Sequence, residues 1–343
     1  MLLMQWCAIS MFFVFIPSLQ EAGPATPTTS GGYHVSGRFT VGGDGGWDYV
    51  IVDPATRRLF VPRATHVIVL STETGKLLGD IPDTAGVHGV ALSANGLGFS
   101  SNGRDESVTV FDAKTLAVKG KVKVGQNPDA IIFDPTADVV IALNGRSNDA
   151  TVIDAAEPLK SATKTVALGG KPEFAVADET GAVWVNLEDK NEIVRFDPKA
   201  AKVTGRYPLT GGEEPSGLAI DSQHHHLFAG CGNKVMVVLD MQTGKVLATP
   251  AIGDGVDACA FDPATGEAFA SCRDGTLTVV KETSPGKFEP TQTVKTMLGA
   301  KTMALDPTSH TVYLPTAEFG DPVPGQRRPP AKPGTFQILV VTK

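Results

Sequence analysis

One short turn recurs along the chain at nearly regular intervals and limits the folds open to it. In its fullest form, at residues 260–270, an apolar strand leads into Asp-Pro-Ala-Thr-Gly and a second apolar strand follows. Proline presets the backbone angle early in such a turn, and glycine tolerates a positive φ late in it. The first residue of the turn recurs every 40 to 44 residues, at Asp53, Ser93, Asp134, Asp178, Asp221, Asp262 and Asp306. This period predicts a propeller in which each repeat forms one four-stranded blade.

The two ends of the chain complete this pattern. A second turn, seen at residues 71–76 and 240–245, ends the third strand, so each repeat supplies two hairpins. The last repeat stops after a third strand at 336–342, and an orphan strand at 34–41 precedes the first repeat. We therefore predict an all-β fold: a seven-bladed β-propeller with four antiparallel strands per blade, its ring closed by the N-terminal strand, which completes the last blade.

The N-terminus differs in composition from the repeats. Residues 2–16 are almost wholly apolar, which predicts a signal peptide at 1–22, with an uncleaved N-terminal anchor as the alternative. A Pro/Thr/Gly linker follows at 23–32, and the propeller takes up 33–343. We expect a periplasmic or secreted monomer with no membrane span in the mature protein. The net charge of −7 gives no basic footprint, so no nucleic-acid partner is expected.

Several short motifs beside the hairpins resemble a known family. They are Gly-Gly-Trp-Asp-Tyr at 45–49, Asn-Pro-Asp-Ala at 127–130, Gly-Lys-Pro-Glu-Phe at 170–174, Gly-Val-Asp-Ala-Cys at 255–259 and Pro-Thr-Ala-Glu-Phe-Gly at 315–320. Over 33–343 the chain resembles the YncE/YVTN-type seven-bladed β-propeller family, in an exported bacterial branch. The Tyr-Val-Thr-Asn motif itself is absent, and residues 142–144 and 185–186 are partial copies. The resemblance implies a fold and an exported location but no activity, because propellers host many functions.

Polar residues precede the first strand of every repeat. The fifth position before each turn residue is Asp48, His88, Asp129, Glu173, Ser216, Asp257 and Lys301. We expect these seven residues, here called the mouth ring, to meet around one end of the central channel. Carboxylates gathered there suit a hard cation or a polar organic ligand, and we predict Asp129, Glu173 and Asp257 as metal ligands. Acid–base catalysis by carboxylates of raised pKa, or a hydrated channel mouth without a ligand, are the alternatives.

A second ring is expected from the ends of the second strands. Its members are Arg63, Asn102, Asn144, Leu187, Cys231, Cys272 and Thr316, and Arg104, Arg146 and Arg273 follow close by. We predict that Arg63, Asn102, Arg104, Asn144 and Arg146 contribute to ligand binding. Arginine forms forked hydrogen bonds with carboxylates, so an anionic ligand would suit this ring. The alternative is that these arginines pair with the mouth-ring acids.

The last repeat carries a Pro-rich insertion at 318–334. It separates the second and third strands of its blade, so it should emerge on the same face as the mouth ring. A loop of this length often forms a lid or a contact surface, and a passive insertion is the alternative.

Cysteines and histidines add two smaller predictions. Cys7 lies in the leader, and equivalent positions in neighbouring blades hold Cys231 and Cys272 too far apart to bridge, so any disulfide should involve Cys259. The histidine run at 224–226 falls in a first hairpin turn, away from the mouth ring, and should be solvent-exposed rather than a metal site.

The sequence therefore predicts an exported binding protein. A polar funnel at the mouth of the channel would take a small ligand, a metal ion or a protein partner, and a divalent metal is the candidate cofactor. One alternative is a propeller lactonase or related hydrolase that uses funnel carboxylates with a metal. A second is a purely structural protein-interaction module. A divalent metal retained by the purified protein would favour the hydrolase over the structural module.

Overall fold

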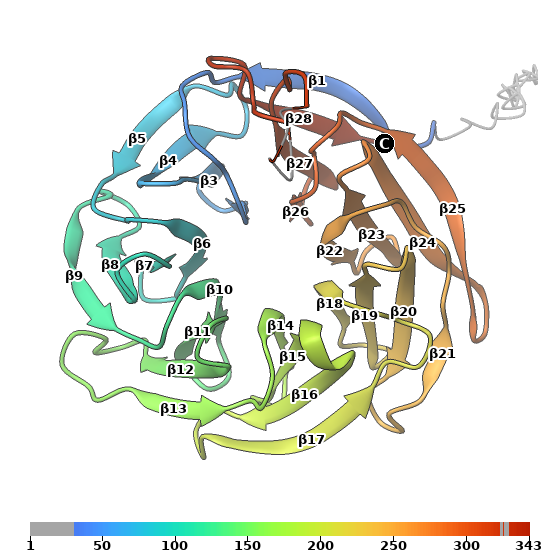
Figure 1. The fold of residues 1–343 in the computed structure, drawn as a ribbon, viewed down its shortest axis with the longest axis horizontal. Coiled ribbons are helices and arrows are strands. Elements are labelled where there is room, and N and C mark those ends of the chain that lie inside the picture. The colour runs from blue at the N-terminus through green and yellow to red at the C-terminus, as the bar shows by residue number, and fades with distance from the viewer. Residues whose placement is uncertain (1–30, 323–324, 326–328) are drawn as a thin grey trace, which may run out of the picture. The chain divides into compact units, whose positions relative to one another are not determined.

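Seven four-stranded sheets stand around a central axis, as the ribbon in Figure 1 shows. The computed structural model describes residues 31–322, 325 and 329–343, and every neighbouring strand pair in it is antiparallel. The fold is thus the predicted seven-bladed β-propeller. The predicted signal peptide at 1–22 and most of the linker lie outside the described residues.

The first six blades each use four consecutive strands. In chain order these are β2 (Ile51–Asp53), β3 (Arg58–Arg63), β4 (His66–Ser71) and β5 (Leu77–Ile81); β6 (Val87–Leu92), β7 (Leu97–Asn102), β8 (Ser107–Asp112) and β9 (Val118–Lys123); β10 (Pro128–Asp134), β11 (Val139–Asn144), β12 (Asp149–Asp154) and β13 (Lys164–Ala167); β14 (Pro172–Ala177), β15 (Val183–Leu187), β16 (Glu192–Asp197) and β17 (Lys202–Pro208); β18 (Pro215–Asp221), β19 (His226–Cys231), β20 (Val235–Asp240) and β21 (Val246–Ala248); β22 (Val256–Asp262), β23 (Glu267–Cys272), β24 (Thr276–Ser284) and β25 (Lys287–Lys295).

Both ends of the chain build the seventh blade. From the C-terminal side come β26 (Ala304–Asp306), β27 (Thr311–Thr316) and β28 (Gln337–Thr342), and β1 (His34–Thr40) pairs antiparallel with β28. Beside this pair the Tyr33 hydroxyl donates a hydrogen bond to Glu267 of blade 6 at 2.9 Å, and Lys343 Nζ lies 3.0 Å from the same carboxylate. The ring is therefore closed by hydrogen bonding between the first and last strands, as predicted.

Aspartates hold the turns that follow the first strands. Five turn carboxylates accept the backbone N–H two residues further on, at 3.1 Å for Asp53, 2.9 Å for Asp134, 2.8 Å for Asp178, 3.0 Å for Asp262 and 2.8 Å for Asp306. Asp221 accepts the N–H three residues further on, at 3.1 Å. In the longer turns the fourth residue after the aspartate has a positive φ. The five residues at this position are Arg57, Asp138, His225, Gly266 and His310. The aspartate hydrogen bond, rather than glycine, is the constant feature that forms these turns.

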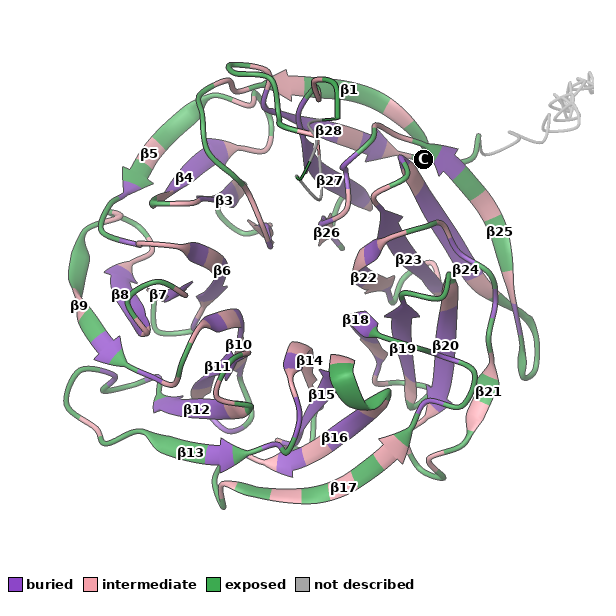
Figure 2. Cartoon of the chain, viewed as in Figure 1, coloured by how far each residue is buried: buried purple, intermediate pink, exposed green. Residues whose placement is uncertain are grey.

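Most of the core lies between neighbouring blades. The second and third strands of each sheet are mostly buried, whereas outer strands such as β9 and β17 contain many exposed residues interspersed with partly buried ones (Figure 2). The hydrophobic clusters combine residues of adjacent blades, as Leu143 of blade 3 and Phe196 of blade 4 show. No helix in the described part of the chain is long and apolar enough to cross a membrane.

The cysteine prediction needs a correction. Cys231, Cys259 and Cys272 are buried free thiols. In the β22–β23 pairing, Cys259 stands opposite Ala270 and Cys272 opposite Val256, so cross-strand register does not bring these two thiols together. Burial raises the pKa of Cys231 and of Cys272 to about 12, which keeps both as neutral, packed side chains. The histidine run behaves as predicted, since His224 and His225 are exposed in their turn.

Candidate functional site

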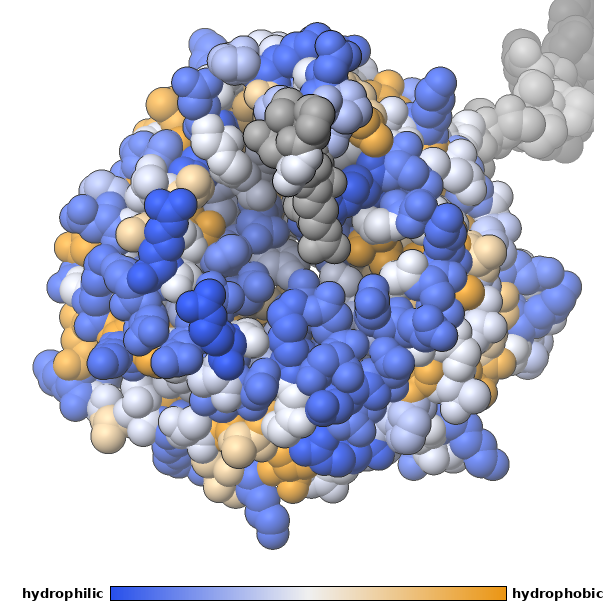
Figure 3. Space-filling view, viewed as in Figure 1, coloured by the Kyte–Doolittle hydropathy of each residue, from blue (hydrophilic) through white to orange (hydrophobic). Residues whose placement is uncertain are grey.

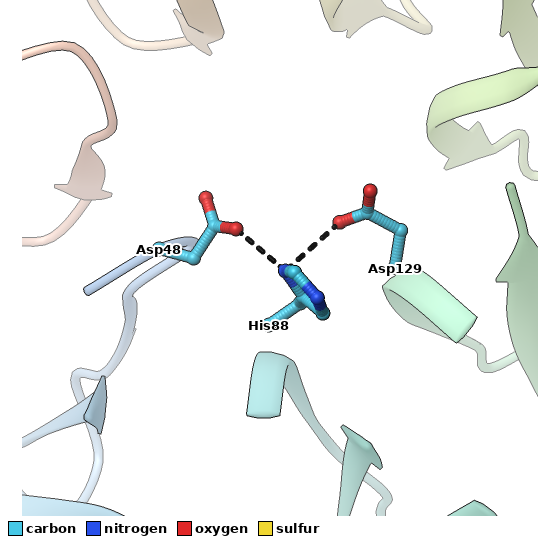
Figure 4. A group of neighbouring side chains, drawn as sticks. All are labelled: Asp48, His88 and Asp129. Carbon is cyan, nitrogen blue, oxygen red and sulfur yellow. Dashed lines mark hydrogen bonds and ion pairs between the residues drawn. The ribbon is translucent and has the colours of Figure 1, made fainter. Parts of the chain in front are cut away.

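Five mouth-ring residues form a chain of alternating charge across five consecutive blades. Lys301 makes an ion pair with Asp257 and lies 3.9 Å from Asp48. His88 Nδ1 lies 2.8 Å from Asp48 Oδ2 and 3.5 Å from Asp129 Oδ1, and Figure 4 shows the imidazole between the two carboxylates. The order is thus acid, base, acid, base, acid, with one residue from each of blades 6, 7, 1, 2 and 3.

The other two mouth-ring residues have different surroundings. Glu173 Oε2 lies 3.1 Å from Lys171 Nζ, and Lys171 also makes an ion pair with Glu188. Ser216 is buried, and its carbonyl accepts a hydrogen bond from Asn186 Nδ2 at 3.1 Å. The spacing in the sequence therefore identified the ring, but Lys171 and Glu188, which lie outside the counted position, are part of its charge balance.

Three acids of the ring, Asp129, Glu173 and Asp257, have raised pKa values. Burial is the main cause that raises the pKa of Asp129 to about 6 and that of Glu173 to about 7. Burial also raises the pKa of Asp257, against the pull of Lys301. For His88, burial alone would lower the pKa, but the hydrogen bond to Asp48 and the charge of Asp129 outweigh it and the pKa is raised. These shifts describe a site in which negative charge is only partly offset.

Tyr49 closes the channel next to the ring. It enters from blade 1, yet its ring lies 5.3 Å from that of Phe174 in blade 4 and its hydroxyl donates to the Glu173 carbonyl at 3.4 Å. Blades 1 and 4 are not neighbours in the ring, so the side chain crosses the channel. Burial, then the charges of the four mouth-ring acids, raise the pKa of Tyr49 well above its ordinary value. The mouth is therefore a cup with an aromatic floor.

The sequence analysis did not predict the contact between Tyr49 and Phe174, although the repeat marks both positions. The fourth position before each turn residue is Tyr49, Gly89, Ala130, Phe174, Gly217, Ala258 and Thr302. Five of the seven are small, and the two aromatic residues are the pair that meets in the channel. Gly217 shows why the others are small, because a Cβ there would lie 2.5 Å from the Cys259 backbone nitrogen.

Part of the predicted second ring is structural. Asn102 and Asn144 are fully buried, and each amide donates to a threonine hydroxyl of its own sheet, at 2.8 Å and 2.9 Å. Arg63 is also buried, donating to the Asp44 carbonyl at 2.8 Å and stacking over Phe336. The prediction that these three bind ligand is not supported by their contacts, because each side chain turns back into its own surroundings.

Of the three arginines that follow the second ring, Arg104 lines a cavity together with Asp48 and His88. Arg104 and Arg146 are exposed, and neither makes an ion pair with any described acid. Arg273 lies close enough to Asp257 to lower that acid's pKa. The interpretation that the arginines neutralise the mouth-ring acids therefore fits Arg273 and not the other two.

Two cavities flank the ring on either side of Trp47. A polar cavity of 330 Å³ is lined by residues including Asp48, His88, Gly103, Arg104 and Asn127. An apolar cavity of 260 Å³ is lined by residues including Leu298, Lys301, Phe319 and Ala331. Figure 3 shows hydrophilic residues gathered around the central hollow of this face. Phe319 and Ala331, two residues of the 318–334 insertion, form a β-bridge with each other and line the apolar cavity together with the mouth-ring residue Lys301.

One group of ligand atoms is close enough to share a metal ion. Single atoms of Asp48, His88 and Asp129 all lie within 4.8 Å of one another. The sequence-based metal prediction named Asp129 together with Glu173 and Asp257. Only Asp129 belongs to the group found among the described residues, because Glu173 turns to Lys171 and Asp257 to Lys301.

Comparison with solved structures supports the fold. The chain is similar to the Kuenenia stuttgartiensis hydrazine synthase, with a TM-score of 0.70 and 15% identity over 78% of this chain and 92% of that one. It is also similar to U3-55K, with a TM-score of 0.71 and 11% identity over 88% and 97%. The RRP9 WD40 repeats match with a TM-score of 0.72 and 11% identity over 88% and 96%. No family model and no curated protein matches the chain. At such low identity these similarities show a β-propeller and nothing of its activity.

Proposed function

We propose that this chain is an exported binding protein that takes a small, positively charged ligand at the mouth of its central channel. The observation that carries the proposal is the convergence of Asp48, Asp129, Glu173 and Asp257 in one cup with few cations between them. The apolar leader and the family resemblance support the exported location and the YncE/YVTN assignment. A monomer fits a ring whose strand edges are closed by its own two ends.

The charge balance of the cup favours a cation over an anion. Among the described residues, the cations near the four mouth-ring acids and Glu188 are Lys171, Lys301, His88 and, beside Asp257, Arg273. Even with His88 protonated, the group keeps an excess of negative charge, and its acids are largely buried. Like charges held together at low exposure are unfavourable unless a bound cation or a proton offsets them.

Calorimetric titration with three dications tests the proposal by measuring their affinity for the protein. Zinc, calcium and putrescine, an organic dication, are titrated into the parent and into the double variant Glu173→Gln/Asp257→Asn. The variant keeps the shape of the cup and removes two charges, so affinity for the bound cation should fall at least tenfold, or ~1.4 kcal/mol.

A matched control removes the same charge elsewhere. The variant Glu157→Gln/Asp254→Asn loses two exposed, lysine-paired acids and should bind as the parent does. The proposal fails if the parent binds none of the three cations, or if both double variants weaken binding equally.

A further inference from the structure

We infer that Asp48, His88 and Asp129 form a binding site for a divalent transition metal, which deepens the proposed function and rests on it. The three residues belong to three blades. Asp48 directly precedes Tyr49 in blade 1, His88 lies in β6 of blade 2, and Asp129 lies in β10 of blade 3. Two of the three residues therefore stand on first strands of the propeller, and Asp48 lies three residues before the first strand of its blade, β2.

The distances fit a shared metal ion. Zinc binds imidazole nitrogen and carboxylate oxygen at about 2.0–2.2 Å, so two ligands of a tetrahedral site lie about 3.3–3.6 Å apart. His88 Nδ1 lies 2.8 Å from Asp48 Oδ2 and 3.5 Å from Asp129 Oδ1. The second pair is already at that spacing, the first would have to open by about half an ångström, and the two carboxylate oxygens lie within 4.8 Å of each other. The ion would lie among the three side chains that Figure 4 draws.

The surroundings leave Asp129 short of partners. Its side chain is only 17% exposed, and its one ion pair among the described residues is the 3.5 Å contact with His88. By contrast, the equally buried Asp257 has Lys301 in direct contact. A carboxylate removed from water with a single distant partner is costly, and a bound dication would supply the missing charge.

The donor set narrows the class of metal. One imidazole and two carboxylates suit zinc and its first-row neighbours better than magnesium or calcium, which prefer oxygen alone. The polar 330 Å³ cavity reaches both Asp48 and His88, so three protein ligands would leave a coordination position open toward it. Gly103 leaves space for the opposite edge of the imidazole, because a Cβ at this position would lie 2.9 Å from His88 Nε2.

Zinc and cobalt titrations of the chelator-treated full chain test this site. Calorimetry measures zinc affinity, and the visible absorption of bound cobalt reports its coordination. His88→Gln and Asp129→Asn should each weaken zinc binding at least 100-fold and abolish the cobalt band. Gly103→Ala, which keeps all three ligands, should weaken zinc binding by crowding the imidazole.

The control must exclude the exposed histidine run. His224 Nδ1 lies 2.7 Å from Asp221 Oδ2, so it is also an Asp–His pair, but in the described part of the chain no second carboxylate pairs with this imidazole. His224→Gln/His226→Gln should leave zinc affinity within about twofold of the parent. If that variant removes zinc binding, or if His88→Gln and Asp129→Asn both retain it while folded by circular dichroism, the inference is overturned.

The same titrations separate this inference from the proposed function. If the parent binds putrescine but not zinc, and Glu173→Gln/Asp257→Asn weakens putrescine binding, the metal site is wrong and the cationic cup stands. If the parent binds neither zinc nor any other cation tested, both are wrong.

Discussion

An acid stands at each end of the first strand of blade 4, and the surroundings shift the pKa values of these two acids in opposite directions. At the turn end, Asp178 accepts hydrogen bonds from Thr180 N, Ala182 N and the Trp184 indole N–H, at 2.8 Å, 3.0 Å and 2.9 Å. Burial alone would raise the pKa of Asp178, but these bonds hold it below its ordinary value. At the mouth end, burial raises the pKa of Glu173 to about 7.

Ionised Asp178 therefore stabilises the fold, whereas ionised Glu173 destabilises it. Asp178 is satisfied by its own hairpin and holds the turn together. Glu173 is five residues earlier and is held near other acids with Lys171 as its one close cation. Proteins retain destabilising groups such as a buried, poorly neutralised acid mainly at functional sites. We therefore expect a ligand at the mouth.

The largest expected effect concerns the floor of the cup. Tyr49→Ala removes a buried ring that packs on Phe174 across the channel, and large-to-small changes of this kind cost about 4 kcal/mol. Tyr49→Phe keeps the ring and loses one long hydrogen bond of 3.4 Å, so it should cost less than about 1 kcal/mol. Urea unfolding of both variants measures the difference. Equal losses would show that the floor is not held by ring packing.

The turn acid comes next. Asp178→Ala leaves two backbone N–H groups and the buried Trp184 N–H without their acceptor, so the free energy of unfolding should fall by about 3 kcal/mol. A thermal melt should show a midpoint lower by ~5–10 °C. Asp178→Asn retains one acceptor oxygen and should lose less. A melt unchanged by Asp178→Ala would contradict the stabilising role of the turn acids.

The mouth acid should respond in the opposite direction and with a pH dependence. The pKa of Glu173 in the folded state is about 7, above its ordinary 4.5, so the folded protein holds an extra proton between these pH values. The contribution of Glu173 to the free energy of unfolding is fully present below about pH 4.5 and is lost as the pH rises through 7. Glu173→Gln should therefore match the parent at pH 4 and be more stable by about 1–2 kcal/mol at pH 8.

Unfolding of the parent and Glu173→Gln across this pH range checks the sign. The charged groups around Glu173 are Asp129, Lys171 and Glu188, and all remain in both proteins. A variant that is less stable than the parent at pH 8 would show that the Lys171 ion pair outweighs burial at this position.

The smallest effects fall within the turns themselves. Gly266 has a φ of 66° with open space around it, and Arg57 has a φ of 56° at the same position of another repeat. Gly266→Ala should cost about 1 kcal/mol, and Arg57→Gly should gain about 0.5 kcal/mol, because a left-handed backbone favours glycine. Paired thermal melts distinguish the two signs. Shifts of the same sign would mean that backbone conformation does not govern these turns.

Repeat spacing predicted the fold because it carries both the number of strands and the chemistry of the turns. It also located the mouth ring, since a fixed distance from a turn fixes which end of the strand a residue occupies. Spacing does not fix where a side chain points. For that reason the spacing does not show that the amides of Asn102 and Asn144 donate to threonine hydroxyls of their own sheets. The spacing marks Tyr49 and Phe174 as the two aromatic residues at their position of the repeat, but it does not show that blades 1 and 4 bring them into contact.

Native mass spectrometry of protein purified without chelator tests the central claim most directly. The account predicts that the parent retains a cation, seen as a fixed added mass, and that Glu173→Gln/Asp257→Asn purified in the same way retains less of it or none. The control Glu157→Gln/Asp254→Asn should retain as much as the parent. A parent found only at its bare mass, and unchanged after incubation with zinc, calcium or putrescine, would contradict the claim that the mouth of the channel is a cation-binding site.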